Sequence, residues 1–188
     1  MLVNLHTHLP TSAKTPRAVG LHPWQAAEGK LPCEEDVLTT DVVGEIGLDK
    51  CCKVNFEQQK QCFEHQLRLA EKHQKTVVLH VVHAFEEVIT MLKRHTLKAV
   101  VFHGFIGSKE QAMQAVKQGY FLSFGARTES SPKTIEALRH TPLDSLFVET
   151  DEAAVTIEDM YATIARLRGV SMADLEEATT KNYARIVD

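Results

Sequence analysis

The chain has 188 residues, of which 44% are hydrophobic and 24% are charged, and its formal net charge at pH 7 is −4. This length and composition are typical of a globular protein, so we expect residues 1–188 to form a single domain. The slightly acidic balance excludes a broad basic surface that neutralises phosphates. A phosphoester substrate would therefore need bound cations or a local basic rim to attract it.

Membrane insertion and disulfide bonding are not expected from the sequence. No apolar run is long enough to cross a bilayer, and the start of the chain lacks signal-peptide features, so we expect a cytoplasmic protein without a membrane partner. Four cysteines, Cys33, Cys51, Cys52 and Cys62, show no CxxC spacing. Reduced, packed thiols are therefore expected rather than a disulfide framework or a cysteine zinc site. The sequence does not indicate an oligomeric state.

Short apolar runs alternate with amphipathic stretches along the chain. Seven runs predict strands, at residues 3–8, 18–22, 42–48, 76–81, 99–105, 120–125 and 145–150. Apolar residues at helical spacing, together with capping signals, predict helices at 34–38, 56–73, 84–94, 108–119, 131–139, 156–168 and 171–187. The run at 76–81 is β-branched and apolar on both faces, which is typical of a buried parallel strand.

This alternation of strands and helices predicts a parallel α/β sheet, either doubly wound or closed into a barrel. The chain has no GxGxxG and no GxxxxGK(S/T) motif, which counts against nucleotide-binding doubly wound folds. Metal-binding residue types end several separate strands, and such ends converge on one mouth in a barrel. We therefore predict a TIM-barrel-like (β/α) barrel with about seven strands. It should be distorted or incomplete, because residues 9–17 are too few for a helical crossover.

The candidate site residues share one position, the point where an apolar run gives way to polar residues. They are His6, His8, His22, Glu45, His80, His103 and Asp151. His6 and His8 lie two apart in a predicted strand, so both imidazoles face the same side and can reach one ion. Taken singly, each residue is better explained as an ordinary polar strand end. Taken together they indicate metal binding, because buried ionisable groups are costly unless they are paired or coordinated.

Leaving His22 aside, the remaining four imidazoles and two carboxylates are too many ligands for one tetrahedral ion and enough for two. Two ions bridged by a carboxylate can activate a water and stabilise both the attacking and the leaving oxygen. Mixed imidazole and carboxylate ligands favour Zn²⁺, Mn²⁺ or Co²⁺, whereas Mg²⁺ prefers more oxygen ligands. The sequence does not choose among these metals.

Several motifs, in chain order, resemble those of the TatD-type metal-dependent nucleases, which belong to the amidohydrolase-like barrels. These motifs are His6-Thr7-His8, GLHP at 20–23, GEIGLD at 44–49, Leu79-His80, HGFIGS at 103–108, SFG at 123–125 and Glu149-Thr150-Asp151. The resemblance covers residues 1–151, with a weaker match at Asn182. It implies a hydrolase that cleaves DNA or short oligonucleotides with two divalent ions, Mg²⁺, Mn²⁺ or Zn²⁺.

The resemblance also implies a role for each candidate residue. One ion would be held by His6, His8 and Asp151, and Asp151 would act as the general base that orients the attacking water.

The second ion would be held by His80 and His103. Glu45 would bridge the two ions, and His22 would lie close to the site and contact the scissile phosphate.

Some positions depart from the family pattern. Trp24 stands where family members usually carry a second histidine, Val82 stands where an arginine is common, and Lys50-Cys51 replaces the tyrosines often found after the GLD motif. The chain is also shorter than usual, near its N-terminus and after Asp151. The metal ligands are thus intact while the residues that surround the substrate are altered.

These departures leave two alternatives to a nuclease. The same site could hydrolyse an ester or amide, as in an aminoacyl-tRNA deacylase, or the chain could be a degenerate barrel that binds a ligand without turnover. Retention of all six ligands counts against the second alternative.

Trp24 could stack a base or cover a gap in the barrel, and we favour the gap slightly. Lys50 and Arg127 are either phosphate contacts or solvated surface charges.

Overall fold

The computed structural model describes residues 1–187, which divide into two compact units. Unit 1 consists of Met1–Thr15 and Phe102–Ile186, and unit 2 of Pro16–Val101 with Val187. The strands are β1 (Ala18–Val19), β2 (Val42–Asp49), β3 (Thr76–Val82), β4 (Val100–Phe102), β5 (Phe121–Phe124) and β6 (Leu146–Val148). The α-helices are α1 (Glu34–Leu38), α2 (Phe56–Lys72), α3 (Phe85–Leu92), α4 (Lys109–Lys117), α5 (Pro132–His140), α6 (Ile157–Arg168) and α7 (Met172–Val187).

The order of elements confirms the predicted α/β class, and the strands follow one another in the sheet in chain order, from β1 to β6. The prediction of about seven strands is wrong, because residues 1–187 contain six. The single-domain organisation stays a prediction. None of the helices in these residues combines the length and the apolar character needed to cross a bilayer.

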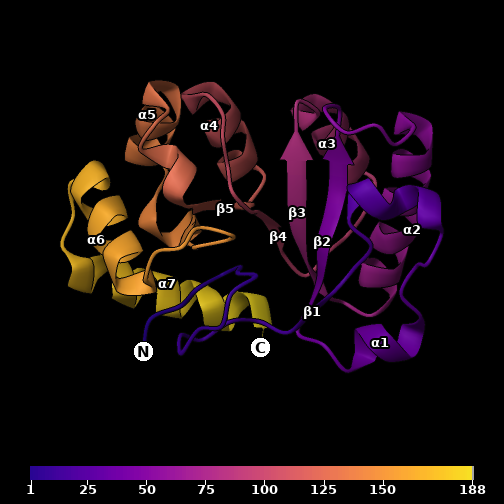
Figure 1. Cartoon of the computed structure of the whole chain (residues 1–188), viewed down its shortest axis with the longest axis horizontal. Helices are drawn as coiled ribbons and strands as arrows, with labels where there is room; N and C mark the ends of the chain where they lie inside the picture. Colours follow the sequence, from indigo (N-terminus) through magenta and orange to yellow (C-terminus); the bar gives the residue numbers. More distant parts are fainter. Residues whose placement is uncertain (188) are drawn as a thin grey trace. The chain divides into compact units, whose positions relative to one another are not determined.

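Unit 2 is built on three parallel strands, β1, β2 and β3, in which β2 pairs with both neighbours. Seven of the eight β2 residues are buried, as expected for a parallel strand covered on both faces. Helix α2 packs on β2 and α3 on β3 (Figure 1). The predicted apolar face of α2 is confirmed, because Phe63, Leu67 and Ala70 are fully buried. These contacts fix the C-terminal ends of β2 and β3.

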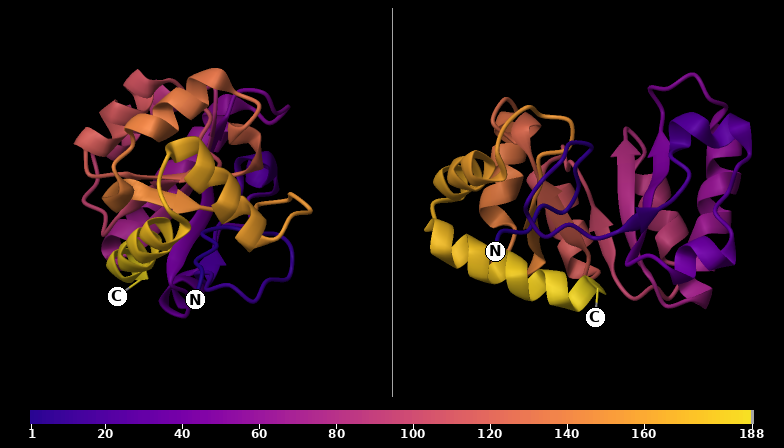
Figure 2. Two further views of the ribbon diagram at one scale, coloured as in Figure 1. Left: turned by 90° about the vertical axis from the view of Figure 1, so that its left-hand side faces the viewer. Right: turned by 60° about the horizontal axis from the view of Figure 1, so that its bottom comes forward.

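Unit 1 contains the parallel pair β5 and β6 together with helices α4 to α7. The N-terminal residues lie beside α7 (Figures 1 and 2), and the amino group of Met1 donates a hydrogen bond of 3.1 Å to Glu176. The fully buried Tyr161 of α6 donates to the carbonyl of Val3 at 2.9 Å and also bonds Thr179 of α7 at 2.7 Å. The first residues of the chain are therefore held to the two last helices.

The predicted strand at residues 3–8 is wrong, although the segment does lie along β6. It makes two isolated parallel bridges, Val3 with Lys14 and Thr7 with Asp151. Between the bridges, the Leu5 N–H donates to the Val148 carbonyl at 3.0 Å, and side chains add to this backbone bond. The amide group of the buried Asn4 donates to Thr150 Oγ1 at 2.8 Å and accepts from the Thr150 backbone N–H at 3.1 Å. The segment is therefore anchored firmly without being a regular strand.

Candidate metal centre

Four of the predicted ligands come together in unit 1, which gathers His6, His8, His103 and Asp151. His6 Nε2 lies 3.2 Å from His8 Nε2, and Asp151 Oδ1 lies 3.8 Å and 3.5 Å from these two nitrogens. The ring of His103 lies 4.8 Å from that of His6, centroid to centroid. We call these four residues, together with Glu149, the unit 1 cluster.

Backbone hydrogen bonds set the position of Asp151 against the N-terminal segment. The N–H of Asp151 donates to the carbonyl of His6 at 3.0 Å, and the N–H of His8 donates to the carbonyl of Asp151 at 3.2 Å. Asp151 has a φ of +52°, in the left-handed region that aspartate and asparagine tolerate better than most residues. This turn directly after β6 brings its carboxylate to the two histidines.

Glu149 orients His103. Both side chains are buried, and Glu149 Oε1 lies 3.2 Å from His103 Nδ1. An ionised carboxylate only accepts hydrogen bonds, so Nδ1 carries the ring proton and Nε2 keeps the lone pair that a metal ligand needs. The second oxygen, Glu149 Oε2, is also buried and has no hydrogen-bond partner among the described residues.

The other predicted residues come together in unit 2, where His22, Glu45 and His80 meet. Glu45 Oε2 lies 3.8 Å from both His22 Nε2 and His80 Nδ1. Asp49 joins them, because its Oδ2 lies 3.1 Å from His80 Nε2. We call these four residues the unit 2 cluster.

A bulge in β2 places Glu45. Val43 pairs with Val77 and Ile46 with Leu79, so two residues of β2 face one residue of β3. Such a bulge bends a strand and redirects its side chains. Further along, Gly47 pairs with His80 at a φ of +144°, and a Cβ there would lie only 2.0 Å from the His80 carbonyl oxygen. A glycine is therefore required for β2 to pass β3 at the site.

Two buried glutamines of α2 hold the strand ends that carry this cluster. Gln59 accepts from the Asp49 backbone N–H at 2.8 Å and donates to its carbonyl at 3.0 Å. Gln66 does the same for Leu21, the residue before His22, at 2.6 Å and 3.1 Å. Asp49 and His22 are thus positioned by one face of the same helix.

Hydrogen bonds also assign the ring protons of the two histidines of this cluster. His80 Nε2 donates to Asp49, so His80 Nδ1, which faces Glu45, keeps its lone pair. His22 Nδ1 accepts from the backbone N–H of Trp24 at 3.2 Å, so His22 Nε2 carries a proton. Burial raises the pKa of Asp49, but hydrogen bonds from Trp24 and His80 outweigh it and hold that pKa below its usual value. Asp49 therefore stays an ionised acceptor at neutral pH.

Each cluster fits a divalent cation by its donor chemistry. In unit 1, ligand atoms of His6, His8 and Asp151 lie within 4.8 Å of one another, and so do those of the set formed by His103, Glu149 and Asp151. In unit 2, ligand atoms of His22, Glu45 and His80 also lie within 4.8 Å of one another, and in the tautomers assigned above Glu45 and His80 are the ones that present lone pairs. Mixed imidazole nitrogen and carboxylate oxygen donors suit Zn²⁺, Mn²⁺ or Co²⁺.

Four residues of these clusters and their supports were not assigned a role from the sequence: Asp49, Gln59, Gln66 and Glu149. A signal existed for the glutamines. Gln59 and Gln66 lie seven residues apart on either side of Phe63, on the face of α2 that the apolar pattern assigns to the core. Polar residues there must have buried hydrogen-bond partners.

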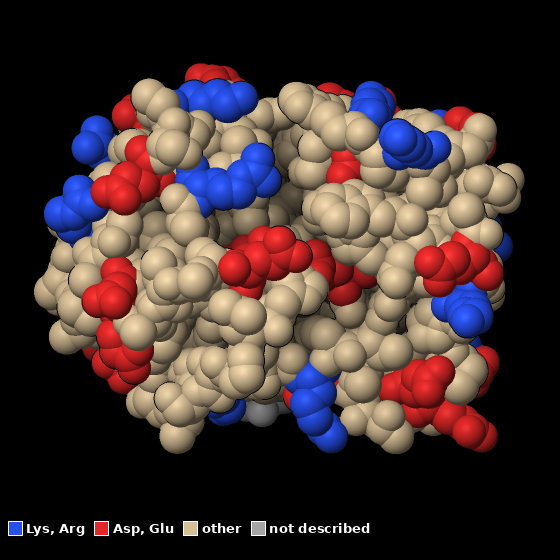
Figure 3. Space-filling view, in the orientation of Figure 1, with Lys and Arg blue, Asp and Glu red and all other residues tan. Residues whose placement is uncertain are grey.

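The surface charge agrees with the acidic composition. On the face shown in Figure 3, the lysine and arginine side chains of the described residues are interspersed with aspartate and glutamate and form no continuous basic patch. Of the two basic residues considered as phosphate contacts, Lys50 forms an ion pair with Glu87 and Arg127 is exposed. Their roles stay predictions.

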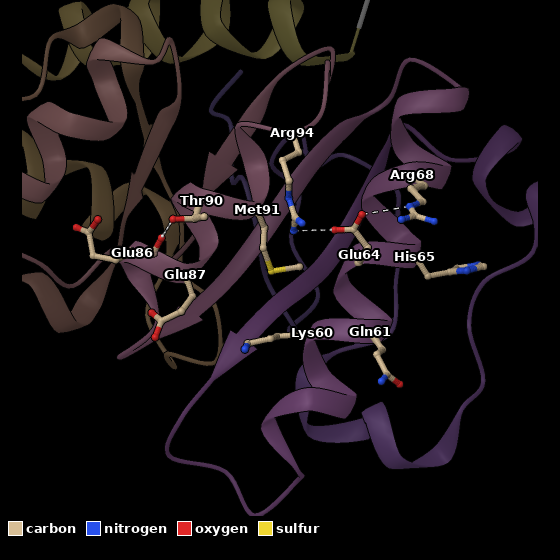
Figure 4. A pocket seen from close by; sticks show the side chains of 10 residues that line it. All are labelled: Lys60, Gln61, Glu64, His65, Arg68, Glu86, Glu87, Thr90, Met91 and Arg94. Atoms are coloured by element: carbon tan, nitrogen blue, oxygen red, sulfur yellow. Dashed lines mark hydrogen bonds and ion pairs between the residues drawn. The ribbon is translucent and has the colours of Figure 1, made fainter.

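A groove of about 800 Å³ lies between α2 and α3 of unit 2 (Figure 4). None of its lining residues belongs to the unit 2 cluster. Two of its cations share one carboxylate, because Glu64 pairs with both Arg68 and Arg94. None of the close groups of three histidine or carboxylate ligands found among residues 1–187 lies in this groove.

Comparison with known proteins places the chain in a family. The sequence model of the family described as TatD related DNase matches residues 6–188. The chain is 29% identical over 196 residues to the uncharacterized metal-dependent hydrolase YabD of Bacillus subtilis, covering 90% of this chain and 76% of YabD. It is 28% identical over 160 residues to the deoxyribonuclease TATDN3 of Homo sapiens, covering 77% of this chain and 58% of TATDN3.

Solved structures of the same family share the fold. The crystal structure of YjjV, a TatD homolog from Escherichia coli, has a TM-score of 0.78 at 26% identity, covering 92% of this chain and 76% of YjjV. A hydrolase TatD family protein from Entamoeba histolytica has a TM-score of 0.79 at 18% identity, covering 94% and 76%. These similarities confirm the predicted TIM-barrel-like α/β fold.

Fold and clusters together are those of a metal-dependent hydrolase. The chain belongs to the TatD family, as its motifs predicted.

Proposed function

We propose that the protein is a divalent-metal-dependent phosphodiesterase that hydrolyses DNA or short oligonucleotides with two bound ions. The observation that carries the proposal is the pair of clusters, each with imidazole and carboxylate donors within 4.8 Å of one another. The name of one relative, deoxyribonuclease TATDN3, supports DNA as the substrate class.

The ligand assignment follows the family motifs. By that assignment His6, His8 and Asp151 would hold one ion, His80 and His103 would hold the other, and Glu45 would be a ligand shared by both. When bound, the two ions lower the pKa of the attacking water and stabilise charge on the attacking and leaving oxygens.

The protein's own residues hold and move protons. The Asp151 side chain is partly exposed, so water can reach it, and its carboxylate takes the proton of the attacking water. His22 carries its ring proton on Nε2 and donates it as a hydrogen bond to a phosphate oxygen. Asp49 and Glu149 keep His80 and His103 in the tautomers that present a lone pair.

Hydrolysis of a labelled single-stranded DNA oligonucleotide in Mg²⁺ or Mn²⁺ tests the proposal. Wild type should cleave it, and Glu45→Gln should lose activity on the order of 100-fold or more, because a shared ligand is lost. Glu35→Gln makes the same change at an exposed carboxylate of α1 in the same unit and should leave activity unchanged. Bound metal is measured in parallel by elemental analysis.

Two outcomes would contradict the proposal. Wild type that leaves every nucleic acid intact but cleaves an acyl ester would be an ester hydrolase. Wild type that retains less than one equivalent of metal after purification with metal present, and that cleaves neither substrate, would be a non-catalytic binding protein.

A further inference from the structure

We propose that Trp24 is a platform on which one nucleobase of the substrate stacks, so that the protein selects nucleic acid with an unpaired base. This inference rests on the proposed function and specifies its substrate as single-stranded or frayed ends. It concerns a residue of this chain that departs from the family pattern.

Trp24 is unusually exposed for its size. It is the one tryptophan of the chain, and 58% of its surface is accessible to solvent. Tryptophan is usually well buried because its ring carries a large apolar surface. The reading that Trp24 covers a gap in the barrel requires a buried ring and is therefore disfavoured. The exposed ring is better explained by a ligand with a flat apolar face.

The exposed ring is also held in place from two sides. The indole Nε1–H donates a hydrogen bond of 2.7 Å to Asp49 Oδ2, and Asp49 is only 3% exposed. The backbone N–H of Trp24 donates to His22 Nδ1 at 3.2 Å. Trp24 lies in the short 3₁₀ helix η1 (Pro23–Glu28), which starts at the buried Pro23. A ring that is already ordered loses little conformational entropy when a ligand binds, so it is suited to recognition.

The ring lies next to the residues that are proposed to act on the phosphate. The centroid of His22 lies 4.8 Å from that of Trp24 at an interplanar angle of 81°, and that of His80 lies 5.8 Å away at 78°. Both contacts are T-shaped rather than parallel stacks, and 58% of the residue stays accessible to solvent beside them. In a nucleotide, base and phosphate are separated by one sugar. A phosphate beside His22 therefore places its own base within reach of Trp24.

The ligand class follows from the chemistry of the ring. An aromatic face stacks on any nucleobase, so the contact adds affinity without selecting a base sequence. In a duplex the bases are stacked on one another, and a base must leave the stack before it can reach a protein side chain. Trp24 therefore favours ends and single strands over duplex interiors.

Two small ligands separate stacking from phosphate binding: thymidine 5′-monophosphate and deoxyribose 5-phosphate. Both carry the same phosphate, and neither has a phosphodiester to cleave. We expect the metal-loaded wild type to bind the nucleotide about tenfold more tightly than the sugar phosphate, within the range reported for base–aromatic stacking. Because Trp24 is the only tryptophan, its fluorescence should be quenched by the nucleotide and not by the sugar phosphate.

For each variant, calorimetry gives the affinity for the nucleotide and for the sugar phosphate, and the ratio of these two affinities is compared with that of wild type. Trp24→Ala should bring the ratio close to one, whereas Trp24→Phe, which keeps a ring and loses the bond to Asp49, should retain most of the preference. A general loss of metal or of folding would weaken both ligands together and leave the ratio unchanged.

Equal affinity of wild type for the two ligands, or a ratio unaffected by Trp24→Ala, would overturn the stacking role. The proposed function fails in a different way. If wild type prefers the nucleotide through Trp24 but leaves oligonucleotides intact, the stacking role stands and the phosphodiesterase function is wrong. If wild type cleaves oligonucleotides but binds the nucleotide no more tightly than the sugar phosphate, the phosphodiesterase function stands and the stacking role is wrong.

Discussion

Asp49 accepts a hydrogen bond of 3.1 Å from His80, and this bond decides which nitrogen of the imidazole faces Glu45. Asp49 is itself fixed by the indole of Trp24, by the backbone N–H of Cys51 and by Gln59. The orientation of one candidate ligand is therefore set by a buried carboxylate that has two other partners, on a residue whose backbone is held by Gln59. Carboxylates that orient a ligating histidine in this way also raise its basicity toward the metal.

Replacing this carboxylate with an amide is expected to weaken metal binding. In Asp49→Asn the charge is lost, and the new amide can donate as well as accept, so His80 is no longer held in one tautomer. We expect metal affinity to fall about 10- to 100-fold. Competition with a chromogenic chelator measures the change. Asp144→Asn, at an exposed aspartate, is the matched control and should bind metal as wild type does.

Glu149→Gln tests the equivalent pair in unit 1. Loss of the charge next to His103 Nδ1 should lower metal affinity by about 10- to 100-fold, because the ring nitrogen that faces the ion becomes less basic. The control is Glu136→Gln in α5, where Glu136 lies 3.3 Å from His140 in an exposed pair. If both variants bound metal equally well, Glu149 would have no role in orienting a ligand.

The predicted ligands could be found from the sequence because each lies where an apolar run ends. The structure brings His22, Glu45 and His80 together in one group and His6, His8, His103 and Asp151 in another, whereas the motifs had predicted His80 and His103 on one ion. The assignment of ligands to ions stays a prediction. The local pattern did not reveal the partners that orient them. Asp49 and Glu149 lie within recognised motifs, but their roles depend on which imidazole nitrogen packs against them, and a motif does not specify that.

The strand count was harder to predict for a physical reason. Residues 3–8 have the composition of a strand, yet Asn4 bonds Thr150 through its side chain, 146 residues away. Side-chain bonds of this kind, which accompany only a few backbone bonds between two distant segments, leave no periodic trace in the sequence. The bulge at Glu45 could not be predicted either, because a shift in register arises from the pairing of two strands and not from the sequence of one of them.

Gly47→Ala is expected to destabilise unit 2 more than an ordinary glycine substitution. At Gly47 the new Cβ would lie 2.0 Å from a carbonyl oxygen, and the φ of +144° is strained for any other residue. We expect a loss of about 3 kcal/mol or more in the free energy of unfolding, measured with urea. Gly119→Ala has a φ of +81° but open space around its Cβ, so it should lose only about 1 kcal/mol. Equal losses would show that steric contact at Gly47 is relieved.

Tyr161 should make stability depend on alkaline pH. Burial raises its pKa to about 12, despite the hydrogen bond with Thr179. Because the folded pKa lies above the ordinary value of about 10, this contribution to stability is complete below pH 10 and is lost as the pH rises toward 12. At pH 8, Tyr161→Phe should be about 1–2 kcal/mol less stable than wild type, since the bonds to Val3 and Thr179 are lost.

Between pH 10 and pH 12 wild type should lose about 2 kcal/mol of stability relative to Tyr161→Phe, because the phenol ionises more easily in the unfolded chain than in the folded one. The advantage of wild type should therefore vanish or change sign near pH 12. Urea unfolding at several pH values measures it, and titration of lysines shared by both proteins cancels in the comparison. Thr179→Val removes one partner but keeps the phenol, so it should retain the dependence on pH. A difference that stays constant up to pH 12 would mean that Tyr161 ionises as easily in the folded chain as in the unfolded one.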